Sequence, residues 1–127
     1  MSGIKFLLDT NIILGLMKSS PEVLALLRPH GLTARQCSYS VITRIELLGF
    51  PGITPEEDAL IRQRLEKFTC LALVPAVEDV AILLRRTRQV KLPDALIAAT
   101  ALSHGLTLLT LDQGMSAVSA NFKPTVS

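Results

Sequence analysis

Short apolar runs alternate along the chain with longer segments in which apolar and polar residues repeat at helical spacing. The apolar runs at 4–8, 71–74 and 106–111 are expected to be buried strands, and 37–40 is a candidate for a further short strand. Pro, Ser and Gly boundaries place helices between them, at 10–17, 21–28, 41–48, 56–68, 77–89 and 93–103. This alternation predicts an α/β fold, a three-layer α/β/α sandwich with a mainly parallel central sheet, formed by a single domain over residues 1–127.

Composition supports a folded, water-soluble domain. Hydrophobic residues make up 49% of the chain and charged residues 19%, which predicts a packed core and excludes global disorder. The apolar runs fall well short of the roughly 20 residues that span a bilayer. Asp9 interrupts the first of them, unlike a signal peptide, so we expect a cytoplasmic protein with no membrane segment. The net charge of +2 is compatible with a nucleic-acid partner but does not identify one.

The cysteines and histidines are not spaced as metal ligands. Cys37 and Cys70 lie far apart and form no CxxC pair, and we expect both thiols to be reduced and structural. His30 and His104 each precede a glycine near an expected helix end, where an imidazole interacts favourably with the helix dipole. Candidate chemistry therefore rests on the acidic residues.

Two acids stand at the ends of the clearest strands. Asp9 follows the first apolar run, and Asp112 follows the last one. If the strands are parallel, both carboxylates emerge at the same edge of the sheet, where α/β proteins bind ligands. Each Asp alone is equally well explained as a helix N-cap, so the pairing of the two positions is what points to a site.

Two further acids lie on apolar helices. Asp94 opens a nearly all-apolar helix, in which Ala98 and Ala101 would let the helix approach the sheet closely; the alternative is a simple interaction with the helix dipole. Glu46 has no broad polar face around it, so we expect it to be buried. Because an unpaired buried carboxylate is costly, a metal ion or an arginine should lie opposite Glu46.

Together the four acids suggest one convergent cluster. Without a cation such a cluster would repel itself and raise some of its pKa values. Coordination by carboxylates alone, without His or Cys, suits Mg²⁺ or Mn²⁺ rather than Zn²⁺. The expected cluster consists of Asp9, Glu46, Asp94 and Asp112.

At these positions the sequence resembles the PIN-domain family, and along nearly its whole length it is similar to the VapC-type toxins. The resemblance is carried by the segments LLDTN, TRIEL, KLPDALIAATA and LLTLD, at residues 7–11, 43–47, 91–101 and 108–112. It implies an endoribonuclease that hydrolyses RNA phosphodiester bonds with Mg²⁺, for which Mn²⁺ can substitute, and leaves a 5′-phosphate and a 3′-hydroxyl. The implied catalytic and metal-binding residues are Asp9, Glu46, Asp94 and Asp112, supported by Asn11 and Thr110.

The same resemblance implies partners and contains one departure. A VapC-type toxin would form a homodimer and be silenced by a small antitoxin, which lays an apolar segment over helices such as 12–17, 21–28 and 56–68. The apolar residues of these helices are equally well explained as core faces. Many relatives carry another acid and then Phe soon after the fourth acid, whereas here Gln113, Gly114 and Met115 follow Asp112, which weakens the expectation of a second metal ion.

A basic run precedes Asp94. If Asp94 lines the site, these cations lie at its rim and could hold RNA phosphates; a solvated helix C-terminus explains them equally well. The run consists of Arg85, Arg86, Arg88 and Lys91.

Three other functions can be compared with the same residues. A phosphoryl-accepting receiver domain needs an acid pair after the first strand, but Thr10 follows Asp9 here, and the run at 71–74 ends at Pro75 without an acid. A housekeeping PIN-domain nuclease of RNA processing and a catalytically weak PIN-like binding module both remain open, because they share the same residues.

Overall fold

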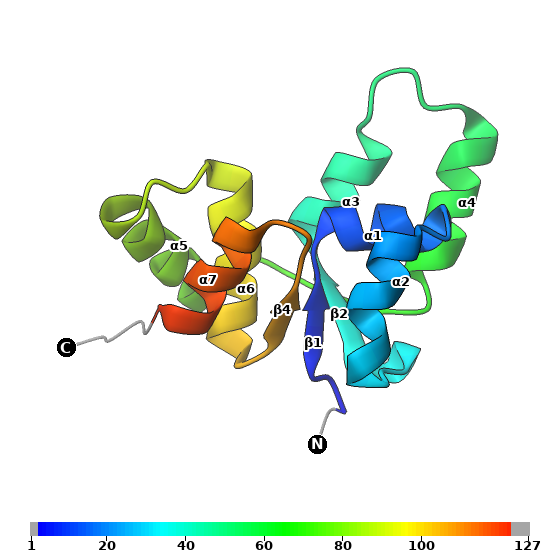
Figure 1. Cartoon of the computed structure of the whole chain (residues 1–127). Helices are drawn as coiled ribbons and strands as arrows, with labels where there is room; N and C mark the ends of the chain where they lie inside the picture. Colours follow the sequence, from blue (N-terminus) through cyan, green and yellow to red (C-terminus); the bar gives the residue numbers. More distant parts are fainter. Residues whose placement is uncertain (1–2, 123–127) are drawn as a thin grey trace.

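The computed structural model of the chain describes residues 3–122 and shows one parallel sheet between two layers of helices (Figure 1). The sheet has four strands in the order β3-β2-β1-β4, and every pair of neighbouring strands is parallel. The strands are β1 (Phe6–Leu8), β2 (Cys37–Ser40), β3 (Thr69–Leu71) and β4 (Thr107–Leu109). The predicted three-layer α/β/α fold is confirmed.

The helices divide between the two faces of the sheet. On one side lie α1 (Thr10–Met17), α2 (Pro21–Leu27) and α4 (Pro55–Leu65), and on the other α5 (Pro75–Thr87), α6 (Leu92–His104) and α7 (Gln113–Asn121) (Figure 1). The remaining helix, α3 (Val41–Leu48), contacts α1, α4 and α6, and two short 3-10 turns occupy Arg28–His30 and Ala34–Gln36. Among the described residues no helix is both long and apolar enough to cross a membrane.

The strands β1 and β4 each supply residues to both cores. In β1, Leu7 packs into the cluster under α5 and α6, and Leu8 packs into the cluster under α1, α2 and α4. In β4, Leu108 and Leu109 divide in the same way. Because successive side chains of a strand point to opposite faces, a strand covered on both sides favours apolar residues at consecutive positions. This explains the consecutive leucines at 7–8 and 108–109.

The strand predicted at 71–74 is shifted to Thr69–Leu71. This edge strand pairs only with β2, and its last pairing joins Leu71 to Ser40, the final residue of β2. Beyond that point no partner strand remains, and Val74 serves instead as the N-cap of α5. The other two apolar runs form shorter strands than expected, and the helix α7 after Asp112 was not predicted from the sequence.

The predicted positions of the histidines are confirmed, while the cysteines differ from each other. His30 and His104 each end a helical segment, and each is followed by a glycine with a left-handed backbone, Gly31 and Gly105. Both thiols are free, as expected, but only Cys37 is buried. Cys70 lies exposed on the edge strand β3, so burial supports the predicted structural role only for Cys37.

Candidate active site

The strand order creates a crevice beside β1. The chain runs from β1 outward to β2 and β3, and then crosses to β4 on the other side of β1. In α/β sheets, ligands bind outside the carboxyl ends of the strands at the point where the crossovers diverge. Leu8 pairs with Leu109, so Asp9 and Thr110 follow at the same level of the two adjacent strands.

Asp9 is buried at this point and fully engaged in hydrogen bonds. Its side chain is 6% exposed. The Oδ1 atom accepts the Thr10 amide at 2.8 Å, while Oδ2 accepts the Thr110 hydroxyl at 2.7 Å and the Asn11 side-chain amide at 3.3 Å. Hydrogen bonds to a carboxylate are strong and offset the cost of burying its charge. The carboxylate of Asp9 is therefore held in one orientation.

Asn11 and Thr110 join the ends of β1 and β4. The Asn11 amide also donates to the Thr110 hydroxyl at 3.3 Å, and its carbonyl accepts the Leu111 amide at 3.2 Å. The Thr110 hydroxyl in turn accepts the backbone amide of Asp112 at 3.0 Å. The two residues expected to support the acids thus contact Asp9 directly and fix the turn that carries Asp112.

Asp112 is exposed and is the N-cap of α7, with its Oδ1 accepting the Met115 amide at 3.1 Å. Gly114 lies against the same oxygen, because a Cβ added there would stand 3.2 Å from Oδ1. The glycine that departs from the family pattern therefore leaves the carboxylate of Asp112 uncrowded.

Glu46 is exposed, so the expectation that it is buried is wrong. Its apolar neighbours Ile45 and Phe50 are themselves 61% and 68% exposed, because the chain does not cover this side of α3. Its partner is a hydroxyl rather than a cation: the Thr10 Oγ1 donates to the Glu46 Oε1 at 2.7 Å.

A second threonine completes this contact. The Thr10 Oγ1 also lies 2.9 Å from the Oγ1 of Thr43, which is fully buried. Thr10 has one hydroxyl proton, and that proton goes to the carboxylate of Glu46, so Thr43 must be the donor to Thr10. Sequence reasoning missed this chain of hydrogen bonds. Its one local signal is that Thr43 stands three residues before Glu46, on the same face of α3.

The carboxyl group of Asp94 lies within reach of the charges of the other three acids. It lies half-buried in the first turn of α6, a helix whose alanines at 95, 98, 99 and 101 are fully buried, as its apolar pattern predicts. Burial raises the pKa of Asp94, and the negative charges of Asp9, Asp112 and Glu46 raise this pKa further, while the positive charge of Lys91 lowers it. The structure therefore brings the four acids, from four different segments, into one electrostatic environment.

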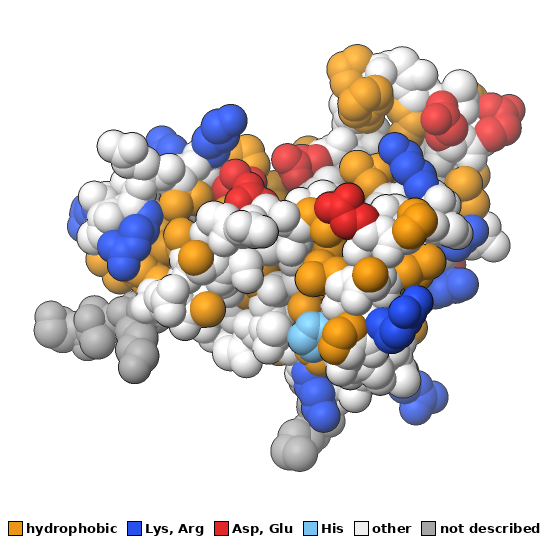
Figure 2. Space-filling model, viewed as in Figure 1, with side chains coloured by type: hydrophobic (Ala, Val, Ile, Leu, Met, Phe, Trp, Pro, Cys, Tyr) orange, Lys and Arg blue, Asp and Glu red, His pale blue; other side chains and the backbone are white. Residues whose placement is uncertain are grey.

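The donors suit a hard cation, although they are not tightly converged. Among residues 3–122 no three acidic, histidine or cysteine side chains lie close enough together to enclose a metal ion. Mg²⁺ usually keeps several waters and is bound through one or two carboxylates, so it does not require such a group. An all-oxygen set without His or Cys fits Mg²⁺ or Mn²⁺ rather than Zn²⁺. In Figure 2 acidic side chains lie over the upper middle of the molecule, between the two helical sides.

The four cations of the basic run are exposed at the end of α5 and in the loop that leads into α6. The run thus lies beside the helix that carries Asp94, as its place in the sequence predicts.

Comparisons with known proteins identify the family and support the fold. The family model of the PIN domain matches residues 6–121. A toxin–antitoxin complex from Klebsiella pneumoniae is similar in structure, with 28% identity, a TM-score of 0.74, and coverage of 86% of this chain and 88% of that one. FitAcB from Neisseria gonorrhoeae matches with 27% identity, a TM-score of 0.72, and coverage of 91% and 93%. VapBC-1 from nontypeable Haemophilus influenzae matches with 26% identity, a TM-score of 0.71, and 92% coverage of both chains. A search of the curated proteins finds no match.

Proposed function

Because the chain belongs to the PIN-domain family, we propose that it is a Mg²⁺-dependent endoribonuclease that acts as the toxin of a toxin–antitoxin pair. The observation that carries the nuclease proposal is the set of four carboxylates around the carboxyl ends of β1 and β4, in which three charges raise the pKa of the fourth. Such self-repulsion is relieved by a divalent cation.

We assign metal binding to Asp9, Glu46, Asp94 and Asp112. A bound Mg²⁺ or Mn²⁺ would supply a water of lowered pKa and would stabilise negative charge on the scissile phosphate. Asp9 presents a buried carboxylate whose orientation Thr110 and Asn11 fix. Thr10 holds Glu46, and α6 carries Asp94 within reach of the charges of the other three acids. These residues position the donors before substrate arrives, which reduces the reorganisation that the reaction requires.

The toxin role is supported by the neighbours, since the K. pneumoniae structure is a toxin–antitoxin complex. The helices α1, α2 and α4, on one face of the sheet, expose apolar side chains that an antitoxin segment could cover. These are Leu14, Leu24 and Leu60, each 37–45% exposed. These are the helices expected from the sequence to receive the antitoxin.

We further propose that the chain acts in the cytoplasm as a homodimer. The exposed Ile45 and Phe50 on and after α3 favour an apolar contact with a second copy.

The test is cleavage of a mixed pool of structured RNAs by the purified protein, with Mg²⁺, with EDTA, and with acid variants. We expect cleavage only with Mg²⁺ or Mn²⁺, and a loss of about 100-fold or more in Glu46→Gln and Asp9→Asn. Glu46 is the safer position for folding, because it is exposed. Asp79→Asn on the exposed face of α5 is the matched control and should cleave normally.

Two outcomes would contradict the proposal. Cleavage that persists in EDTA or in Glu46→Gln would exclude the assigned site. A folded, antitoxin-free protein that cuts no RNA with either metal would favour the catalytically weak binding module. The toxin role is tested separately by expression in bacteria: the wild type should arrest growth and Glu46→Gln should not, whereas a housekeeping nuclease would leave growth unchanged.

A further inference from the structure

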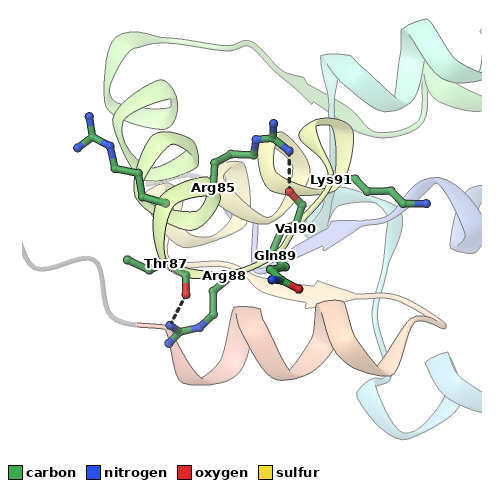
Figure 3. A pocket seen from close by; sticks show the side chains of 7 residues that line it. Arg85, Thr87, Arg88, Gln89, Val90 and Lys91 are labelled. Carbon is green, nitrogen blue, oxygen red and sulfur yellow. Dashed lines mark hydrogen bonds between the residues drawn. The ribbon is translucent and has the colours of Figure 1, made fainter.

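The last turn of α5 and the loop that leads into α6 form an open, basic groove. The groove has a volume of about 570 Å³ and is lined by the seven residues from Arg85 to Lys91 (Figure 3). Four of these residues are cationic and none is acidic. On the neighbouring surface, Glu78 lines a second and more apolar groove together with Arg85 and Arg86. The loop therefore concentrates positive charge on a small concave surface.

Two of the cations shape the groove. The Arg85 Nη1 donates to the Val90 carbonyl at 2.9 Å, across the loop. The Arg88 Nη1 donates to the carbonyl of Thr87 at 3.2 Å, and its guanidinium lies 5.5 Å from the centre of the Phe122 ring. Figure 3 shows Arg85 reaching Val90 and Arg88 lying beside α7. Arg85 and Arg88 thus contact backbone carbonyls of this segment and the Phe122 ring. These contacts fix the shape of the groove without a ligand.

The other two cations, Arg86 and Lys91, make no side-chain hydrogen bond within the part of the chain that the structure describes. Among residues 3–122 the only ion pair joins Arg62 to Asp58, so no cation of the groove is paired with a carboxylate at ion-pair distance. In Figure 3 Lys91 points away from Arg85 and Arg88. Like charges that lie close together without ion-pair partners repel one another, and an anion bound among them would relieve that repulsion.

The groove adjoins the acidic site. Lys91 is the N-cap of α6 and stands three residues before Asp94. It is also close enough that its charge acts on the Asp94 carboxyl. A cluster of four carboxylates repels a polyanion, so a nuclease with this site needs cations at its rim to retain a nucleic-acid backbone.

We propose that the groove binds backbone phosphates of the substrate RNA and leads the strand to Asp94. Arg86 and Lys91 make the phosphate contacts, while Arg85 and Arg88 keep the groove open. This inference rests on the proposed ribonuclease function and adds the place where the RNA is held. Phosphate contacts position a nucleic acid without reading its sequence, so the groove supplies affinity and direction rather than specificity.

The experiment measures RNA binding apart from cleavage. The probe is an end-labelled pool of structured RNAs, titrated with protein in EDTA by filter binding, from about 50 mM to about 200 mM NaCl. The test variant is Arg86→Gln/Lys91→Gln. The matched control is Arg35→Gln/Arg64→Gln, which removes the same charge from exposed positions on the opposite helical side of the molecule.

We expect the test variant to weaken binding about tenfold or more at the lower salt concentration. The salt dependence, the slope of log K against log [NaCl], should become shallower by about 1.4 to 1.8, the value for two lost phosphate contacts. In Mg²⁺ its cleavage should show a raised KM and a nearly unchanged kcat. The control should change affinity less than about threefold.

The groove and the nuclease can fail separately. If the wild type cleaves RNA and the test variant cleaves with an unchanged KM and an unchanged salt slope, the groove is refuted while the function stands. Equal weakening in the test and control variants would also refute the groove, since it would mean that only net charge matters. If the wild type cleaves nothing but the test variant still loses affinity and slope as expected, the groove stands and the nuclease proposal fails.

Discussion

The contact between Thr10 and Glu46 gives the sharpest test of how this site is built. Glu46 is exposed, and the Thr10 hydroxyl at 2.7 Å is the hydrogen-bond partner of its side chain among residues 3–122. Thr10→Val keeps the shape of the side chain and removes the donor. We expect Glu46 to lose its fixed orientation and to bind metal less well.

The expected effects of Thr10→Val on metal affinity and on the free energy of unfolding can be measured separately. A residue that orients a metal ligand typically affects metal affinity by about 10- to 100-fold, so the Mg²⁺ concentration for half-maximal cleavage should rise by that factor in Thr10→Val. The free energy of unfolding should fall by about 1–3 kcal/mol, because water can replace the hydroxyl at exposed Glu46 but the fully buried Thr43 hydroxyl loses its acceptor. Thr43→Val should act in the same direction but less strongly, because Thr43 reaches Glu46 only through Thr10.

The assay is initial cleavage rate against Mg²⁺ concentration, with thermal unfolding in EDTA measured in parallel. Thr100→Val is the matched control, since it removes a buried hydroxyl that bonds only the Leu96 carbonyl of its own helix. In a Glu46→Gln background, Thr10→Val should have almost no further effect on metal dependence. The reasoning is refuted if Thr10→Val and Thr100→Val have the same half-maximal Mg²⁺ concentration as the wild type.

Three further predictions follow from the packing and the charges. Gly15→Ala should destabilise the fold by about 1–3 kcal/mol in denaturant unfolding, because the new Cβ would stand 2.2 Å from a methyl of Val23 on α2; adding Val23→Ala should recover part of the loss. In the folded protein an alkylating reagent should modify exposed Cys70 and spare Cys37 until unfolding, because burial raises the pKa of the Cys37 thiol to about 11; labelling read by mass spectrometry would contradict this if both thiols reacted together. Asp94→Asn should raise the melting temperature of metal-free protein at neutral pH. The pKa of Asp94 is raised in the folded state, so its contribution to stability is present at low pH and lost as pH rises through that pKa; the difference between variant and wild type should shrink on acidification, and an unchanged difference would exclude this cause.

Part of the site could be predicted because its signal is local. An apolar run followed by Asp identifies a buried strand and the residue at its carboxyl end, and parallel pairing then places Asp9 and Asp112 at one edge. The alanines of α6 predict its burial against the sheet, and hence the position of Asp94. Strand lengths could not be predicted in this way, because β3 ends where its partner β2 ends.

The contacts within the site have no such signal. Thr10 and Thr43 are 33 residues apart, and no periodicity relates a hydroxyl at the start of α1 to one inside α3. Asn11 and Thr110 lie 99 residues apart, and their link to Asp9 depends on the side-by-side placement of β1 and β4. Sequence order gives the elements that carry these side chains, but only packing decides which hydroxyl meets which carboxylate.

The helix α3 shows a further limit of pattern reasoning. Apolar residues around Glu46 predict that something covers this part of the helix, and that inference is physically sound because exposed apolar side chains are costly. The expected burial of Glu46 was wrong because the pattern does not say whether the same chain or another chain covers this part of α3. Thr43 and Leu47 face the interior of this chain, whereas Ile45 and Phe50 are exposed to solvent beside Glu46.

If the proposed second copy covers Ile45 and Phe50, the carboxylate of Glu46 will be partly buried only in the dimer. Ile45→Ser should then give a monomer by light scattering and also alter the metal dependence of cleavage, whereas a change in neither property would mean that α3 is open to solvent in the active enzyme.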